Sequence, residues 1–149
     1  MGTMDPSSTH GILNPAAGLR HFWLDRLPPP EDLEDVVERF WTVRWDLAPG
    51  EIFTQEILPH PAVNLSLERS THDARDARPH GLRAHGISTR RFAADLEGRG
   101  IVLGTKLTPA GLYPFARIPL SMLFDRVVPV EEVMGASPEL SGVEALPPP

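Results

Sequence analysis

The sequence predicts a mainly β (α+β) fold, a small antiparallel β-barrel or sandwich with a few short helices at its N- and C-terminal ends. Two observations favour this class. Apolar and polar residues alternate along about six short, closely spaced segments, as they do in half-buried strands. Proline and glycine together account for 17 + 12 = 29 of the 149 residues, which favours many turns over long helices.

The length is typical of one domain with less regular flanks. We expect a flexible N-terminal extension over residues 1–18, a β-barrel domain over residues 19–136 and a proline-rich tail or linker over residues 137–149. There is no signal peptide pattern, and no segment reaches the roughly 18 apolar residues that span a bilayer. We therefore expect a cytoplasmic protein without membrane contact. The absence of cysteine excludes disulfides and thiolate chemistry.

The first part of the domain is expected to place one strand after a short helix. Residues 19–27 are apolar enough to pack, and the three prolines at 28–30 form a stiff spacer. Residues 31–38 predict a short helix with acidic residues in its first turn. Residues 39–47 predict a strand that turns at 48–51 and presents one apolar face made of Trp41, Val43, Trp45 and Leu47.

The middle of the chain predicts four further strands around one long loop. Residues 53–58 and 62–68 are strand candidates, and the second presents Val63, Leu65 and Leu67 on one face. Residues 69–79 are polar and without periodicity, which is typical of a mobile loop. Residues 82–88 and 91–96 are two more strand candidates.

The last part predicts a hairpin followed by short helices. Residues 97–100 have the glycines of a hairpin turn, and residues 101–108 form the returning strand, in which Gly104 marks a bulge or a close backbone approach. Residues 119–126 predict a short helix, and residues 130–134 one more helical turn that ends at a glycine. The first of these helices is expected to turn inward Leu120, Leu123 and Phe124.

Aromatic residues indicate a candidate binding face. Trp41 and Trp45 share one side of a strand, and Phe92 is expected on a partner strand. Such rings can line an apolar ligand pocket with polar anchors among them, or they can simply pack in the core, and the pattern does not separate the two. The candidate ligand-binding residues are Trp41, Trp45, Gln55, His60, Asn64, His85 and Phe92.

Histidines raise the question of a metal site. A cupin-like site places a His-x-His motif and a glutamate on neighbouring strands. No such motif occurs here, and His80 and His85, five residues apart, would fall on opposite faces of one strand. We therefore expect no metal and no other cofactor, although a cupin-like metalloenzyme that uses His60, His80 and His85 remains an alternative.

No motif of a known catalytic type is present. The chain has no Gly-x-Ser-x-Gly elbow, no Walker loop and no dinucleotide fingerprint. We therefore expect no enzyme activity and name no catalytic residue. The net charge of −6 also argues against direct binding of nucleic acid by this domain.

Six segments in order resemble the N-terminal domain of a branch of bacterial AraC-type transcriptional regulators. They are residues 37–47, 58–65, 86–92, 96–100, 108–115 and 125–129. The resemblance extends over residues 27–136. The Arg90-Arg91 and Asp125-Arg126 pairs match the family's pattern, and a structural role for these arginines competes with ligand contact.

The resemblance implies a ligand-sensing or dimerisation domain, cupin-like in fold, that controls an attached DNA-binding domain. In this family a pair of helix-turn-helix motifs follows the sensor, and the residues after Gly135 are too few to form them. The chain is then either a truncated regulator or a free-standing sensor, and it would contact DNA only through a C-terminal domain missing here. The partners implied are an unknown small-molecule effector and a second copy, with residues 118–130 as a dimer face. A free-standing barrel that binds a small molecule or a partner is the alternative.

Overall fold

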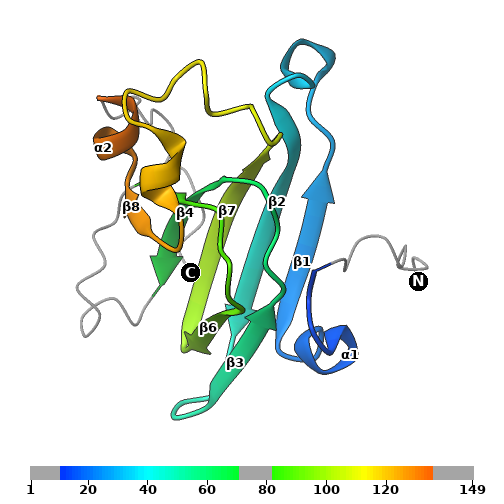
Figure 1. Ribbon diagram of the computed structural model, residues 1–149. Helices are drawn as coiled ribbons and strands as arrows, with labels where there is room; N and C mark the ends of the chain where they lie inside the picture. Colours follow the sequence, from blue (N-terminus) through cyan, green and yellow to red (C-terminus); the bar gives the residue numbers. More distant parts are fainter. Residues whose placement is uncertain (1–10, 71–81, 136–149) are drawn as a thin grey trace.

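The protein is a small β-sandwich in which all strand pairs are antiparallel. The computed structural model describes residues 11–70 and 82–135 (Figure 1). One sheet has six strands in the order β1-β2-β7-β4-β5-β8, and the second has two strands, β3 and β6. The mainly β fold with short helices near both ends is therefore confirmed.

The strands of the large sheet differ widely in length. They are β1 (Phe22–Leu27), β2 (Val37–Asp46), β7 (Arg99–Leu107), β4 (Asn64–Ser70), β5 (Arg83–His85) and β8 (Val127–Pro129). The small sheet consists of β3 (Ile52–Ile57) and β6 (Phe92–Glu97). The helical elements are α1 (Pro15–Gly18), α2 (Val130–Met134) and two 3-10 turns, Glu31–Leu33 and Leu120–Leu123.

Two of the predicted helices are wrong. Residues 31–38 contain only a 3-10 turn, because β2 already begins at Val37, which pairs with Leu107 of β7. β-Branched residues favour strands, and this sheet pairing outweighs the local helical pattern. Residues 119–126 also form only a 3-10 turn, and Phe124 is exposed where we expected it to point inward. The helical turn that ends at Gly135 is confirmed as α2.

The expected hairpin at residues 97–100 is also wrong. Its two arms belong to different sheets, since β6 pairs with β3 whereas β7 pairs with β2 and β4. Gly98 has φ +61° and alone connects the two strands. The Leu47 amide donates to the Gly98 carbonyl over 2.8 Å. Positive φ is thus required here, as expected, but at a corner between the sheets.

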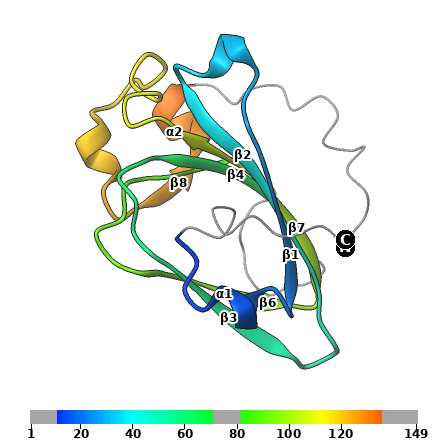
Figure 2. The same ribbon diagram turned by 90° about the vertical axis from the view of Figure 1, so that its right-hand side faces the viewer.

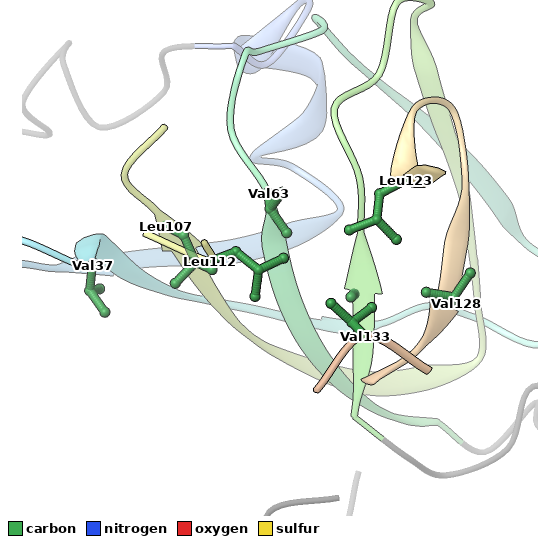
Figure 3. Packing of buried hydrophobic residues seen from close by; sticks show 8 residues of the cluster. Val37, Val63, Leu107, Leu112, Leu123, Val128 and Val133 are labelled. Atoms are coloured by element: carbon green, nitrogen blue, oxygen red, sulfur yellow. The ribbon is translucent and has the colours of Figure 1, made fainter. Parts of the chain in front are cut away.

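The two faces of the large sheet are covered differently (Figure 2). The outer face carries one apolar cluster, shown in Figure 3, which residues 108–126 and α2 help to close. The inner face is turned toward the small sheet. Its apolar cluster joins Phe22, Trp45, Leu47 and Leu96, which are all less than 10% exposed.

The N-terminal segment packs on the small sheet. Ile12 forms a β-bridge with Ile57, and the Leu13 amide donates to the Glu56 carbonyl over 3.1 Å. Gln55 is buried, and its Nε2 donates to the carbonyl oxygens of Leu13 and Glu56. Residues 11–18, which we assigned to a flexible extension, are therefore attached to the domain.

Candidate functional site

The inner face of the large sheet can be read as cross-strand rows, because directly paired residues point to the same side. Two rows are mainly apolar. The first joins Phe22, Trp45, Gly100 and Ser70, and the second joins Leu24, Val43, Val102 and Glu68. Most of these residues belong to the inner apolar cluster, beneath the small sheet.

The next two rows along the same face are mainly polar. One joins Arg26, Trp41, Gly104, Ser66 and Arg83. The other joins Arg39, Lys106, Asn64 and His85. We call these two rows the polar end of the inner face. A polar interior requires a reason, because burying unpaired polar groups costs free energy.

Trp41 lies flat across β7 in the polar end. A Cβ atom at Gly104 would come within 1.9 Å of the Trp41 ring atom Cε2, so only glycine leaves room for the indole. The ring thereby reaches the next strand, where its Nε1 donates to Asn64 Oδ1 over 3.2 Å. The close approach that we expected at Gly104 is confirmed, and its partner is an aromatic ring.

A second set of contacts continues from β4 to the small sheet. Ser66 Oγ lies 2.6 Å from His85 Nε2, and Ser66 is buried. The His85 ring meets Phe92 edge to face, with ring centroids 6.2 Å apart. His85 therefore connects the polar end of the large sheet to the beginning of β6.

A β-bulge brings a carboxylate into the polar end. The β2–β7 register shifts between Val37 and Arg39, which leaves Glu38 without a direct partner strand residue. A bulge re-aims a side chain out of strict alternation. Lys106 Nζ donates to Glu38 Oε1 over 2.9 Å, and Arg39 donates to the same oxygen.

Lys106 is the most buried cation at this end. Its side chain is only 10% exposed, whereas that of Glu38 is 34% exposed. Lys106 Nζ also lies 3.2 Å from His60 Nε2, and since an ammonium can only donate, the imidazole nitrogen accepts. His60 itself is an exposed loop residue, and it lies on the solvent side of this ammonium.

The charges of this cluster shift one another's pKa values. Burial, and then the positive charge of Lys106, lower the pKa of His60 below its ordinary value. Burial opposes ionisation of Glu38, but the hydrogen bonds from Lys106 and Arg39 outweigh it and lower the pKa of that carboxyl. Burial and the nearby Arg39 guanidinium lower the pKa of Arg26. The polar end is thus a region of crowded positive charge.

The structure brings together five of the seven candidate residues. Trp41, His60, Asn64, His85 and Phe92 all lie at the polar end or border it. The other two do not.

Trp45 and Gln55 lie in different surroundings. Trp45 belongs to the inner apolar cluster, and its Nε1 donates to the Glu97 carbonyl over 3.0 Å. The Gln55 amide group donates to the N-terminal segment, as described above.

Sequence reasoning missed the charged members of this site, Arg26, Glu38, Arg39, Arg83 and Lys106. The signal was present for one of them. Lys106 is the only lysine of the chain and stands at a polar position of a predicted strand. Arg39 likewise has the same strand parity as Trp41. Glu38 could not be found in this way, because a bulge breaks the alternation.

A metal centre receives no support from the part of the chain that the structure describes. There, no three histidine or acidic side chains gather as ligands would. His60 and His85 make different contacts, with Lys106 and with Ser66 respectively. His80 and His72 lie outside the described residues.

A hollow lies at the other end of the molecule, near the start of β1. It has a volume of about 350 Å³ and is lined by Leu19, Arg20, His21, Phe22, Trp23, Asp46, Leu47 and Glu51. His21 stacks on Phe53 with ring centroids 4.2 Å apart, and its Nδ1 lies 3.1 Å from Glu51 Oε1. None of the predicted site residues lines this hollow.

Comparison with known proteins assigns the domain to a family. Residues 25–129 match the family described as Domain of unknown function (DUF6597). The chain belongs to this family. The DUF6597 match begins within β1 and ends with β8, so it spans the large sheet and the small sheet alike.

No curated protein and no solved structure matches the chain. Within the described ranges, no helix is both long and apolar enough to cross a bilayer. The DUF6597 assignment is in line with a domain similar to the N-terminal part of AraC-type regulators.

Proposed function

We propose that this DUF6597 domain senses a small molecule and regulates an attached DNA-binding domain, as in AraC-type transcriptional regulators. The observation that carries the proposal is the polar end of the inner face. A domain that served only as a scaffold would fill the space between its sheets with apolar side chains. Here, half of that face carries Arg, Lys, Asn, Ser and His around a partly exposed indole.

The resemblance and the family match support the same proposal by sequence similarity, independently of the geometry of the site. The family match covers residues 25–129, and the resemblance to AraC-type sensor domains covers nearly the same stretch. The net charge of −6 is consistent with a domain that leaves DNA binding to another part of the protein. The proposal includes no catalytic step.

The mechanism would follow from the way the sheets are joined. A ligand shifts a conformational equilibrium only by its difference in affinity for the two states. A molecule at the polar end would contact both sheets, since His85 of β5 already touches Phe92 of β6. Binding there would favour one spacing of the sheets, and an attached domain would respond to that difference.

The test is a thermal-shift screen of the chain against metabolite classes, followed by tryptophan fluorescence. A ligand at tenfold or greater excess over its Kd stabilises the folded state and raises Tm by about 2–6 °C. We expect the fluorescence response to fall most in Trp41→Phe, where only the response of Trp45 to a new sheet spacing would remain, and to persist in Trp23→Phe, since Trp23 is exposed on β1. A screen in which no compound class raises Tm or alters Trp41 emission would overturn the sensing function.

A second candidate role, dimerisation, is favoured by one observation. The segment that closes the outer face leaves apolar side chains in solvent: Tyr113, Phe115, Met122 and Phe124 are 47–75% exposed. Part of the predicted dimer face over residues 118–130 is instead buried in the domain's own core. Light scattering over a concentration series tests this role. Phe124→Ser should weaken self-association, whereas Trp23→Ser on β1 should not.

A further inference from the structure

The polar end has more positive than negative groups. Four cations, Arg26, Arg39, Lys106 and Arg83, stand in its two rows. The carboxylates on this face are Glu38 and, one row farther along β4, Glu68. This local excess contrasts with the net charge of −6 for the whole chain. Partly buried positive charge attracts an anion more strongly than the same charge in water.

Two of these cations have hydrogen-bond donors to spare. The Arg39 guanidinium has five N–H donors and gives one hydrogen bond, to Glu38, among the described residues. Lys106 has three donors and uses two, on Glu38 and His60. Both donate to the same oxygen of Glu38. Their side chains are 27% and 10% exposed, so a ligand can reach Arg39 directly.

Arg83 adds an unsatisfied group to the same face. Its Nε and Nη1 are buried and have no hydrogen-bond partner within the described ranges. Arg83 pairs with Ser66, which pairs with Gly104 beneath the Trp41 ring. Buried donors without an acceptor cost free energy, so a further hydrogen-bond acceptor is favoured at this end of the face.

Trp41 offers a flat apolar surface beside these cations. One side of its ring rests on Gly104, and the residue is only partly buried. Among the described residues, Trp41 belongs to neither apolar cluster. Arg39 and Trp41 are two residues apart on one face of β2, which corresponds to about 7 Å. That spacing suits a ligand with an acidic group at one end and one ring at the other.

From these contacts we infer that the polar end binds a small carboxylate with a flat apolar body. The carboxylate would accept from Arg39 and Lys106, in competition with Glu38, and the ring would stack on Trp41. Arginine binds carboxylates with two parallel hydrogen bonds, and aromatic rings stack in offset geometry. This inference specifies the ligand class of the proposed sensor and depends on that function.

The experiment compares flat carboxylates with their neutral isosteres on the whole chain. The probes are benzoate and 2-naphthoate, each beside its alcohol, with acetate as the anion that lacks a ring. Because Lys106 is the only lysine, protein labelled with ¹⁵N-lysine gives one side-chain ammonium signal in NMR. We expect an aromatic carboxylate to shift this signal, and to bind about tenfold more tightly than its alcohol or acetate.

Matched variants test the contacts. Arg39→Gln should weaken carboxylate binding about tenfold or more and leave binding of the alcohol unchanged. Glu38→Gln removes the competing carboxylate and should strengthen carboxylate binding several-fold. Arg44→Gln is the control, because Arg44 lies on the same strand but on the outer face, where it pairs with Asp25 over 3.4 Å.

The outcomes separate the two proposals. If a neutral compound binds in a Trp41-dependent way while no carboxylate of the panel does, the ligand class is wrong and the sensor function stands. Carboxylate binding that is the same in Arg39→Gln and Arg44→Gln would also overturn the assigned contacts. If no probe and no screened compound binds, both proposals fail.

Discussion

Two tryptophans of β2 have the same local geometry and opposite surroundings. Trp45 lies over Gly100 and Trp41 over Gly104, each pairing directly with its glycine on β7. Trp45 is 3% exposed, packs with Phe22 and Leu96, and donates to a backbone carbonyl. Trp41 is partly exposed and donates to the side chain of Asn64.

The difference shows that pairing with a glycine does not decide whether a tryptophan is buried. The side chains and strands that pack over the ring decide it. The strand and its partner glycines bring both indoles to the inner face. At Trp45, the small sheet and a corner at Gly98 close over the ring. At Trp41, charged and amide side chains surround it instead. Four residues along one strand thus separate a core position from a candidate binding position.

The largest expected effect comes from removing each indole. Trp45→Ala should lower the free energy of unfolding by about 3–5 kcal/mol, as is typical of a buried tryptophan. Trp41→Ala should cost about half of that, because its ring is only partly buried. Urea unfolding followed by far-UV circular dichroism measures both. Trp23→Ala, at an exposed position, is the control. Equal losses for Trp41 and Trp45 would contradict the comparison.

The second effect concerns the glycines. A Cβ atom at Gly100 would lie 2.1 Å from Trp45 Cζ2, and the enclosed ring has little room to move. Gly100→Ala should therefore destabilise the fold by about 1–3 kcal/mol. Gly104→Ala should cost less stability, because the Trp41 ring is less enclosed, but it should break the hydrogen bond to Asn64.

A double-mutant cycle checks the cause. If the indole is what the new methyl group meets, the combination of Gly104→Ala with Trp41→Ala should cost less than the sum of the single changes. Additive losses would mean that the alanine disturbs the strand backbone and not the ring.

The third effect tests whether the polar end is retained for stability. Lys106→Met keeps the volume of the aliphatic stem and removes the ammonium. Glu38 would keep its bond to Arg39 and some solvent contact, so no isolated buried charge remains. We expect a change of at most about 1 kcal/mol in unfolding free energy. A loss several times larger would assign Lys106 a structural role.

The smallest effect is a dependence on pH. The pKa of His60 is lowered in the folded protein from its ordinary value of 6.5. The neutral imidazole is thus the form that folding favours, and its contribution is complete above pH 6.5 and is lost as the pH falls below it. Between pH 7 and 5, Tm should fall about 1–2 °C less in His60→Gln than in the original chain. Lys106→Met should also reduce the dependence of Tm on pH over the same range, because the positive charge beside His60 is removed.

Glu38 acts in a more acidic range. Its pKa is lowered from 4.5, so its contribution is present above that value and is lost as protons bind below it. Glu38→Gln should reduce acid sensitivity only below about pH 4.5. At pH 6 the variant should be less stable than the original chain, because the carboxylate contribution is fully present there, and equal stability at pH 6 would contradict the contacts described for the carboxylate.

Local patterns predicted the strands and their faces better than the connections between them. Alternation of apolar and polar residues identified β2 and β7 from the sequence, although burial along these two strands does not itself alternate in the structure. It did not reveal that β6 and β7 belong to different sheets. A hairpin turn and a corner between two sheets both favour glycine with positive φ at this position. The glycine therefore predicts the turn of the backbone, but not the strand with which each arm pairs.

The candidate site was predictable only in part. Trp41 was found because it shares one side of a predicted strand with Trp45, and Asn64 because a polar side chain near such rings can anchor a ligand. Which of the two tryptophans is core depends on where the small sheet ends, and that is a non-local property of the fold. Glu38 enters the site through a bulge, which no periodic pattern records. β1 was missed as a strand, because only its apolar content was recognised.

The one-residue connection at Gly98 has a mechanical consequence. A joint without spare length cannot absorb a tilt of β6, so such a tilt must pass into β7. β7 is the strand whose glycines carry both indoles. Motion of the smaller sheet would therefore displace both Trp41 and Trp45. The fluorescence of a partly exposed and of a buried tryptophan would change together.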